Sequence, residues 1–368
     1  MAKSNGSKGD ISRMKSNLSR TYNSLEEDVV SLMSEHYGEG IDGYSLWAEI
    51  PTCLKAWWFG IENAPDHPAQ LHYAWLNNTD GTPNKLGLND GIRLATTKAI
   101  ELLKLNYEKP VTLLDIGCGV GGAALQTDLF LQRQEVKDFQ IHGISIVQKQ
   151  IQVAQNRSRK FGAINSNFIV GNFLNLPYES DHFKGITAFE TLCYIPPENK
   201  LSLLRGLLRV LTSGGRMVIY DAYFVRRPGT VEEQNWFNKF RNGWTLPAMV
   251  TLEEMNHLAM KAGFEIEKSH TADNEVRTSV DLIYRRAKYI GLPLLRIYRM
   301  LKNLGHESKL LQRTGIHSLI AEDFIHACYA QKELVDRGLM TYHVHVLRKP
   351  KVDLTDVLFS TSRSSPQE

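Results

Sequence analysis

The sequence predicts an α/β fold built on a mostly parallel sheet. After residue 90, apolar segments of strand length alternate with segments of helical periodicity, which is typical of parallel strands joined by crossover helices. The first strand, Val111–Ile116, runs into four glycines at positions 117, 119, 121 and 122. Glycine lets the chain turn tightly and lets a ligand lie against bare main chain, at the positive end of the helix that follows.

Seven strands are expected in order along the chain. They are placed at 111–116, 139–146, 166–170, 182–189, 216–223, 264–270 and 340–347, and the last is expected to be antiparallel. Helices are expected at 90–105, 123–132, 147–161, 198–211 and 251–262. Asp90 is the expected N-cap of the first helix, and Thr251 with Glu254 forms a capping box at the start of the last. A turn is expected at 212–215 because the residues are Thr-Ser-Gly-Gly.

Composition excludes several classes of protein. The 368 residues are 42% apolar and 23% charged, as in a soluble globular protein, and a net charge of +3 is too small to argue for nucleic acid. No apolar run approaches the roughly 20 residues that a membrane span needs. The basic N-terminus lacks the apolar core of a secretory signal, so we expect a cytoplasmic location and reduced thiols. The spacing of the four cysteines does not suit a zinc site, so we expect no structural metal.

Outside the sheet, aromatic residues concentrate at 20–80 and 224–250, and a basic, largely helical insertion precedes the last strand. We expect these pieces to form a cap around an apolar substrate chamber; ordinary helix packing is the alternative. The predicted organisation is a disordered tail at 1–20, a helical cap segment at 21–89, a core at 90–272, a cap insertion at 273–335, the last core strand at 336–348 and a C-terminal tail at 349–368.

Asp115, two residues before the first glycine, narrows the interpretation of the glycine run. With this aspartate, Asp-Ile-Gly-Cys-Gly-Val-Gly-Gly resembles the first motif of the class I S-adenosylmethionine (SAM) methyltransferases. Four further segments resemble the sterol, tocopherol and isoprenoid branch of that family. They are Leu71-His72-Tyr73-Ala74-Trp75, Gly143-Ile144-Ser145-Ile146 with Gln150, Glu190-Thr191-Leu192-Cys193-Tyr194, and Leu211-Thr212-Ser213-Gly214-Gly215. The resemblance implies a Rossmann-like, seven-stranded, mostly parallel sheet with an added helical cap.

The resemblance also implies SAM as the cofactor. It assigns cofactor binding to Asp115, Gly117, Gly119, Gly121, Ser145, Gln150, Asn172 and Phe173. Asp115 would face the cationic end of the methionine moiety, and Ser145 with Gln150 would bind the ribose. Asn172 would accept a hydrogen bond from the adenine amino group, and Phe173 would stack on the ring.

Glu190, at the carboxyl end of the fourth strand, is the best-placed carboxylate for catalysis. It is expected to stabilise a cation and act as a base, or to bind the methionine amino group instead. His72 and Tyr194 are secondary candidates, each with structural hydrogen bonding as the alternative. In Tyr194 this chain departs from the histidine of the branch.

The function implied is methylation of an apolar small molecule, first of all C-methylation of an isoprenoid or sterol-like substrate. Arginines at 277, 285, 286, 296 and 299 suit a prenyl diphosphate, which would bring Mg²⁺, or form a solvated basic face. N- or O-methylation of a specialised metabolite and an inactive SAM-binding scaffold stay open, as does a homo-oligomer. Ile195-Pro196-Pro197-Glu198 lacks the polar and aromatic residues of base-methylating enzymes, which disfavours nucleic acid.

Overall fold

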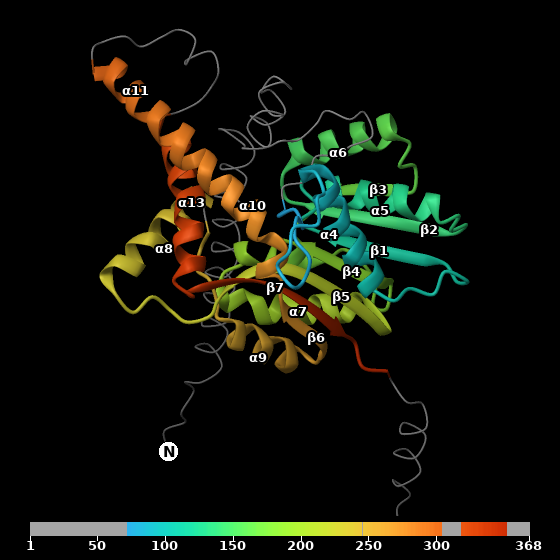
Figure 1. Cartoon of the computed structure of the whole chain (residues 1–368). Helices are drawn as coiled ribbons and strands as arrows, with labels where there is room; N and C mark the ends of the chain where they lie inside the picture. Colours follow the sequence, from blue (N-terminus) through green and yellow to red (C-terminus); the bar gives the residue numbers. More distant parts are fainter. Residues whose placement is uncertain (1–71, 245, 304–317, 352–368) are drawn as a thin grey trace, which may run out of the picture.

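The computed structural model describes residues 72–244, 246–303 and 318–351 (Figure 1). Within these residues, seven strands form one sheet in the order β3-β2-β1-β4-β5-β7-β6. The strands are β1 (Val111–Ile116), β2 (Phe139–Ser145), β3 (Ser166–Val170), β4 (Phe183–Phe189), β5 (Leu211–Phe224), β6 (Glu265–Thr271) and β7 (Met340–Arg348). Strands β1 to β5 pair in parallel, and β7 inserts antiparallel between β5 and β6. The predicted fold class and the antiparallel last strand are therefore confirmed.

Helices cover both faces of the sheet, and each face has its own apolar core. One face carries α4 (Leu88–Leu102), α5 (Gly122–Arg133) and α6 (Gln148–Phe161), and the other carries α7 (Pro197–Val210) and α9 (Leu252–Ala262). Neighbouring residues of β1 serve opposite faces, as a strand requires: Leu113 packs in the cluster with Ala95 of α4, and Leu114 packs in the cluster with Leu207 of α7. The sheet is thus buried on both sides, which leaves its carboxyl edge for a ligand.

Two local predictions are wrong. Gly87, not Asp90, is the N-cap of α4, and Asp90 pairs with Arg93 inside the first turn at 3.4 Å. Residues 212–215 do not form a free turn, because β5 begins at Leu211 and includes them with a shift of register against β4. Backbone hydrogen bonds between this stretch and Lys349, 3.0 and 2.9 Å long, recruit it to the sheet. The capping box of Thr251 and Glu254 is confirmed at the start of α9.

A helical lobe lies beside the sheet (Figure 1). It contains α8 (Val231–Trp244), α10 (Asp273–Arg286), a π-helical segment η4 (Ala287–Gly291), α11 (Leu292–Asn303) and α13 (Ser318–Asp336). Phe237 and Phe240 of α8 pack with Ala330 and Leu334 of α13 in a buried cluster. The predicted tail at 1–20, most of the predicted cap segment at 21–89 and most of the C-terminal tail lie outside the described residues. Whether the lobe acts as a substrate cap therefore stays a prediction.

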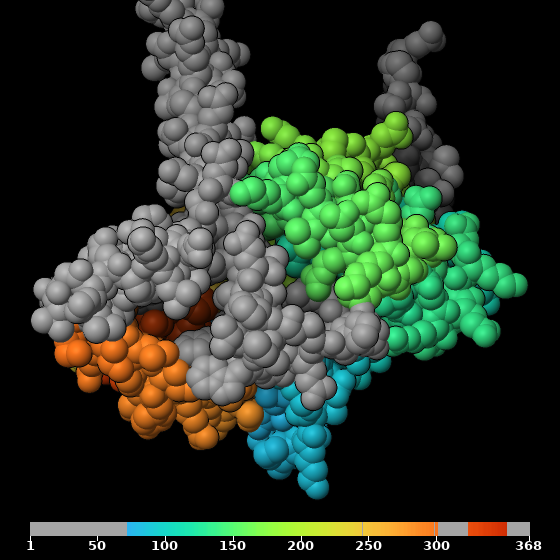
Figure 2. Space-filling view, turned by 90° about the horizontal axis from the view of Figure 1, so that it is seen from above, coloured from blue at the N-terminus to red at the C-terminus, as the bar shows by residue number. Residues whose placement is uncertain are grey.

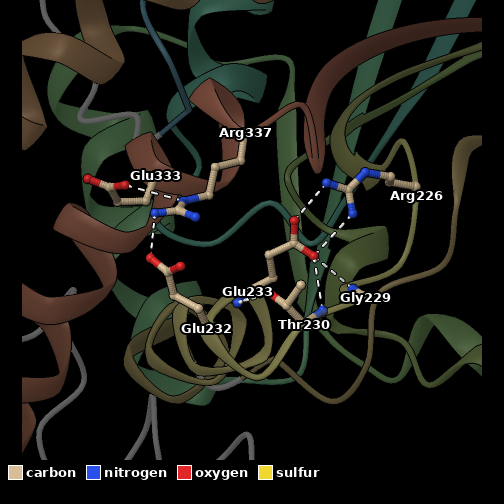
Figure 3. A network of polar contacts seen from close by, with 7 residues as sticks. All are labelled: Arg226, Gly229, Thr230, Glu232, Glu233, Glu333 and Arg337. Atoms are coloured by element: carbon tan, nitrogen blue, oxygen red, sulfur yellow. Dashed lines mark hydrogen bonds and ion pairs between the residues drawn. The ribbon is translucent and has the colours of Figure 1, made fainter.

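Polar contacts tie the two main helices of the lobe together and anchor them to the chain after β5 (Figure 3). Arg337, just after α13, donates to Glu232 of α8 at 2.7 Å. Arg226 binds Glu233 through two nitrogens, at 2.7 and 3.1 Å, and holds the pKa of that carboxyl at about 2. The backbone N–H of Gly229 also donates to Glu233, at 2.8 Å. The lobe is therefore joined to the sheet by more than apolar packing.

Candidate active site

The glycine turn begins where β1 ends, at the carboxyl edge of the sheet. Gly117, Gly119 and Gly121 have φ angles of +65°, +52° and +80°, in the left-handed region that favours glycine. Gly121 is the N-cap of α5, and no side chain caps the helix. The positive end of α5 therefore faces the turn with its capping position free of a side chain.

Protein packing, as well as a ligand, accounts for two of these glycines. A Cβ at Gly117 would lie 2.4 Å from Cγ2 of Thr191, and a Cβ at Gly121 would lie 2.9 Å from Cβ of Ala154. The Thr191 hydroxyl donates to the carbonyl of Ile116 at 3.1 Å, so the loop after β4 is held directly against the glycine turn. At position 117 a third cause thus adds to the tight turn and the room for a ligand that were expected: the side chain of Thr191 occupies the space of a Cβ.

Asp115 is buried one strand residue before the turn. Its Oδ1 accepts from the Thr187 hydroxyl at 3.0 Å, whereas Oδ2 has no hydrogen-bond partner among the described residues. Burial raises the pKa of Asp115 to about 7, against the opposing effect of the hydrogen bond from Thr187. A buried carboxylate oxygen without a donor is unfavourable, so a cationic group of a ligand would supply what the protein lacks. The site therefore fits the ammonium group of SAM.

Neutral polar side chains lie at the end of β2 and in the first turn of α6. Ser145 and Gln150 are both buried, and the Ser145 hydroxyl donates to Oε1 of Gln150 at 3.1 Å. These groups have the chemistry to bind ribose hydroxyls, as the resemblance implies. The pair thus lies at the edge where β2 gives way to α6.

The predicted adenine contacts are already partly used by the protein. Asn172 caps the short helix η2 (Phe173–Asn175), its Oδ1 accepting from the N–H of Leu174 at 3.0 Å. A carbonyl oxygen can accept a second hydrogen bond. Phe173 is buried in the same apolar cluster as Ile144. The adenine roles of Asn172 and Phe173 stay predictions.

Glu190 has an unusual backbone conformation directly after β4. Its φ is +49°, a left-handed value for a residue that is not glycine, and its N–H donates to the carbonyl of Tyr220 at 2.7 Å. Such a conformation costs about 1–3 kcal/mol and persists where the surroundings enforce it, typically at functional sites. Oε1 of Glu190 accepts from the Tyr342 hydroxyl at 2.9 Å and from the Tyr73 N–H at 3.0 Å. Burial raises the pKa of Glu190 to about 8, although both hydrogen bonds oppose the shift.

Aromatic rings surround this carboxylate. The rings of Tyr73 and Tyr342 meet edge to face at 5.1 Å, and the Tyr73 hydroxyl donates to Oε1 of Gln331 at 2.6 Å. Burial raises the pKa of both phenols well above the usual range, so both stay neutral donors. Sequence reasoning missed Tyr342 and Gln331, because they lie 152 and 258 residues from the partners they bind. Only folding brings them together.

The two secondary candidates are engaged elsewhere. His72 stacks on Phe189 at 4.7 Å, and its Nε2 lies 3.4 Å from both the Ile92 carbonyl and the Thr96 hydroxyl of α4. Burial lowers the pKa of His72 to about 4, so the ring is neutral and a weak base. Tyr194 is partly buried beside the α8–α13 cluster. These contacts favour positioning roles, and the catalytic roles of both residues stay predictions.

Two buried residues of opposite charge, Lys200 and Asp221, support the loop that follows Glu190. Lys200 and Asp221 are 2% and 1% exposed. The Lys200 ammonium donates to the carbonyl of Leu192, and Asp221 accepts from the N–H of Cys193 at 2.9 Å. Burial lowers the pKa of Lys200 and raises that of Asp221, while each charge opposes the shift of the other. Together the two residues hold the short helix η3 (Leu192–Tyr194), and no local pattern predicted their role.

Comparisons with known proteins agree with this geometry. A family model described as "Methyltransferase domain" matches residues 108–279. The 27-O-demethylrifamycin SV methyltransferase of Amycolatopsis mediterranei (strain S699) is 30% identical over 249 residues, covering 66% of this chain and 78% of the relative. The 24-methylenesterol C-methyltransferase 3 of Arabidopsis thaliana is 26% identical over 201 residues, 53% of each protein, so the chain spans about half the length of that relative.

Among solved structures, geranyl diphosphate methyltransferase in complex with GPP and sinefungin matches with a TM-score of 0.59 at 15% identity. The match covers 88% of this chain and 99% of that one, which shows a shared fold. The glycine turn, the unsatisfied buried carboxylate before it, the sheet order and these similarities all agree. The chain belongs to the class I SAM-dependent methyltransferase family.

Proposed function

We propose that this chain methylates a carbon atom of an apolar isoprenoid or sterol-type substrate. The observation that carries the proposal is the environment of Glu190. Its carboxylate lies beside the aromatic rings of Tyr73 and Tyr342, its backbone is left-handed, and burial raises its pKa to about 8. A base with a pKa near the working pH is suited to taking a proton from a reacting group. The sterol C-methyltransferase relative supports a substrate of this class.

When bound, SAM supplies an activated methyl group. Asp115 and the glycine turn would hold its amino-acid end, and Ser145 with Gln150 would hold its ribose. An alkene carbon that gains a methyl group leaves a positive charge on the substrate. The carboxylate of Glu190 and the rings of Tyr73 and Tyr342 would stabilise that charge. Glu190 would then accept the proton from the adjacent carbon, whose bonding electrons restore the alkene.

O-methylation is the second candidate, because the rifamycin-modifying relative is both the more identical and the better covered of the two curated relatives above. There Glu190 would accept the proton of a substrate hydroxyl. A prenyl diphosphate acceptor is supported by the fold shared with geranyl diphosphate methyltransferase, and would call for Mg²⁺. The two candidate reactions thus share Glu190 as the proposed base and differ in the acceptor.

The test is product analysis with SAM labelled with ¹³C in its methyl group. The purified chain is incubated with pools of sterols, prenyl diphosphates with and without Mg²⁺, and hydroxylated polyketides. We expect a labelled product whose methyl shift in ¹³C NMR indicates attachment to carbon. Glu190→Gln should reduce turnover by about 10²-fold or more, whereas Glu198→Gln, an exposed glutamate on α7, should not.

A methyl group on oxygen would replace the proposal with the second candidate. SAM binding without product from any pool would refute both and favour the inactive scaffold. Full turnover by Glu190→Gln would remove this carboxylate from the mechanism.

A further inference from the structure

We propose that α11 and the preceding η4 segment dock this protein on the surface of a bilayer that contains anionic lipids. The feature is an outward apolar stripe on α11. Leu294, Ile297 and Met300, three residues apart, are 55%, 50% and 56% exposed, while Leu295 beside them is buried. Residues three apart lie on one helix face. The helix therefore has one apolar side toward the protein and a second toward solvent.

The stripe is a cluster, not scattered exposure. Eleven large apolar side chains are exposed among the described residues, and four of them, including Tyr289 in η4, fall between positions 289 and 300. Single exposed apolar residues are ordinary on protein surfaces, whereas contiguous ones mark interaction sites.

The charge of this segment selects the partner. Residues 282–306 contain no aspartate or glutamate, and six arginines and lysines lie between 285 and 302. Arg285 and Arg296 are exposed and form no ion pair with any described residue. An apolar stripe flanked by cations is the pattern of a helix that lies in the interface of an anionic membrane. A second copy of the chain would instead bring like charges together in a two-fold contact.

The position of the helix fits this partner. The α10–η4–α11 run extends outward from the lobe (Figure 1), and its orange atoms form a margin of the molecule in Figure 2. No helix in the described ranges is long and apolar enough to cross a bilayer, so the contact would be peripheral.

The inner end of the same helical run lines an apolar pocket. Ile283, Arg286 and Ala287 contribute to it, together with residues of α8 and α13: Trp244, Phe324, Ile325 and Cys328. Ala287 lies seven residues before Leu294, or about 10 Å along the helix. The pocket encloses about 30 Å³, which is too small for a sterol or prenyl chain, so it shows only that the inner side of this helical run is apolar. Docking itself requires no substrate.

The test is sedimentation of the full chain with vesicles of phosphatidylcholine, alone or with phosphatidylserine added. We expect binding that needs phosphatidylserine and weakens with salt. A triple variant removes the stripe: Leu294→Ser, Ile297→Ser, Met300→Ser. Its affinity for the anionic vesicles should fall by roughly tenfold or more. The matched control, Ile164→Ser, Val231→Ser, Met260→Ser, removes three apolar side chains elsewhere that are at least as exposed, and it should bind like the wild type.

Charge is tested separately. Arg285→Gln with Arg296→Gln should reduce binding to the anionic vesicles by roughly 30-fold, since each basic residue near such a surface contributes about 1 kcal/mol and about 1.36 kcal/mol corresponds to a factor of ten. Arg205→Gln with Lys261→Gln, exposed residues of α7 and α9, is the control. Thermal unfolding checks that all variants fold.

Unchanged binding by the apolar triple variant would overturn the proposal. Equal binding to the neutral vesicles would overturn it too, as would no binding of the wild type to the anionic vesicles. In that last case, a wild-type dimer that the triple variant converts to a monomer would assign the stripe to a contact between two copies of the chain. SAM binding and turnover on a detergent-dispersed substrate are measured in parallel, so a failure of docking is distinguished from a failure of the proposed reaction.

Discussion

Replacing Tyr342 with phenylalanine tests the polar environment of Glu190 with the loss of one oxygen atom. The Tyr342 hydroxyl donates to Oε1 of Glu190 at 2.9 Å, and only the N–H of Tyr73 would remain as a donor to that atom. A hydrogen bond to a charged group contributes about 1.5–3 kcal/mol, and one pKa unit corresponds to about 1.36 kcal/mol. Because the hydroxyl favours the ionised carboxylate, its loss should raise the pKa of Glu190 by about one to two units.

The consequence is a shift in the pH dependence of catalysis. A base must be ionised to act, so activity should increase as pH rises through the pKa, which is about 8 in the wild type. In Tyr342→Phe the rising limb of kcat/KM should move to about pH 9–10. At pH 7 the variant should therefore be about 10- to 100-fold slower, while at high pH the two proteins should converge.

Tyr223→Phe is the matched control. Its hydroxyl is also buried on the sheet but has no hydrogen-bond partner among the described residues. In Tyr223→Phe the rising limb of kcat/KM should therefore stay at the wild-type pH. A Tyr342→Phe enzyme with the wild-type limb and full activity at pH 7 would show that Glu190 is not the titrating base. A uniform loss at every pH would indicate that Tyr342 acts on substrate position instead.

Three further predictions concern stability and cofactor binding. Asp115→Asn should weaken SAM binding, yet it should raise the free energy of unfolding by about 1–3 kcal/mol above pH 7. The reason is that burial raises the pKa of the Asp115 carboxyl to about 7, so the wild type loses stability as pH rises from about 4 to 7 and the carboxyl ionises. Gly117→Ala should destabilise by about 3 kcal/mol or more in urea, because its Cβ meets Thr191, whereas Gly162→Ala, with φ +73° and open space, should cost about 1 kcal/mol. Lys200→Met should cost about 3–5 kcal/mol by leaving Asp221 buried and uncompensated.

Each of these has a result that would contradict it. An Asp115→Asn stability gain that is independent of pH would mean that the carboxylate is not the cause. Equal losses at the two glycines would remove the contact with Thr191 as an explanation. Failure of an added Asp221→Asn substitution to restore Lys200→Met would argue against the uncompensated charge.

The elements that could be predicted from sequence are those with local causes. The strand Val111–Ile116, the glycine turn and the capping box at Thr251 depend on residues a few positions apart, and the structure has all three. The turn expected at 212–215 failed because a distant segment around Lys349 pairs with it. Local composition carries no information about such a partner.

The candidate site shows the same division. Glu190 could be singled out because it ends a predicted strand in a motif-like segment. Its hydroxyl donor, Tyr342, could not, because the order of the last strands in the sheet depends on which edges remain open after the others pair. The packing of Thr191 on Gly117 could not be predicted for a similar reason. The sequence of a glycine motif does not show whether a ligand or a protein side chain occupies the space next to the glycine Cα.

The antiparallel insertion of β7 has a consequence for biosynthesis. Of the seven described strands, the one that pairs on both sides, with β5 and with β6, is the last in chain order. Until this strand pairs, two sheet edges are bare, and the carboxylate at position 190 lacks its phenolic donor. A polypeptide that ends before residue 340 would therefore expose these edges and be prone to aggregate.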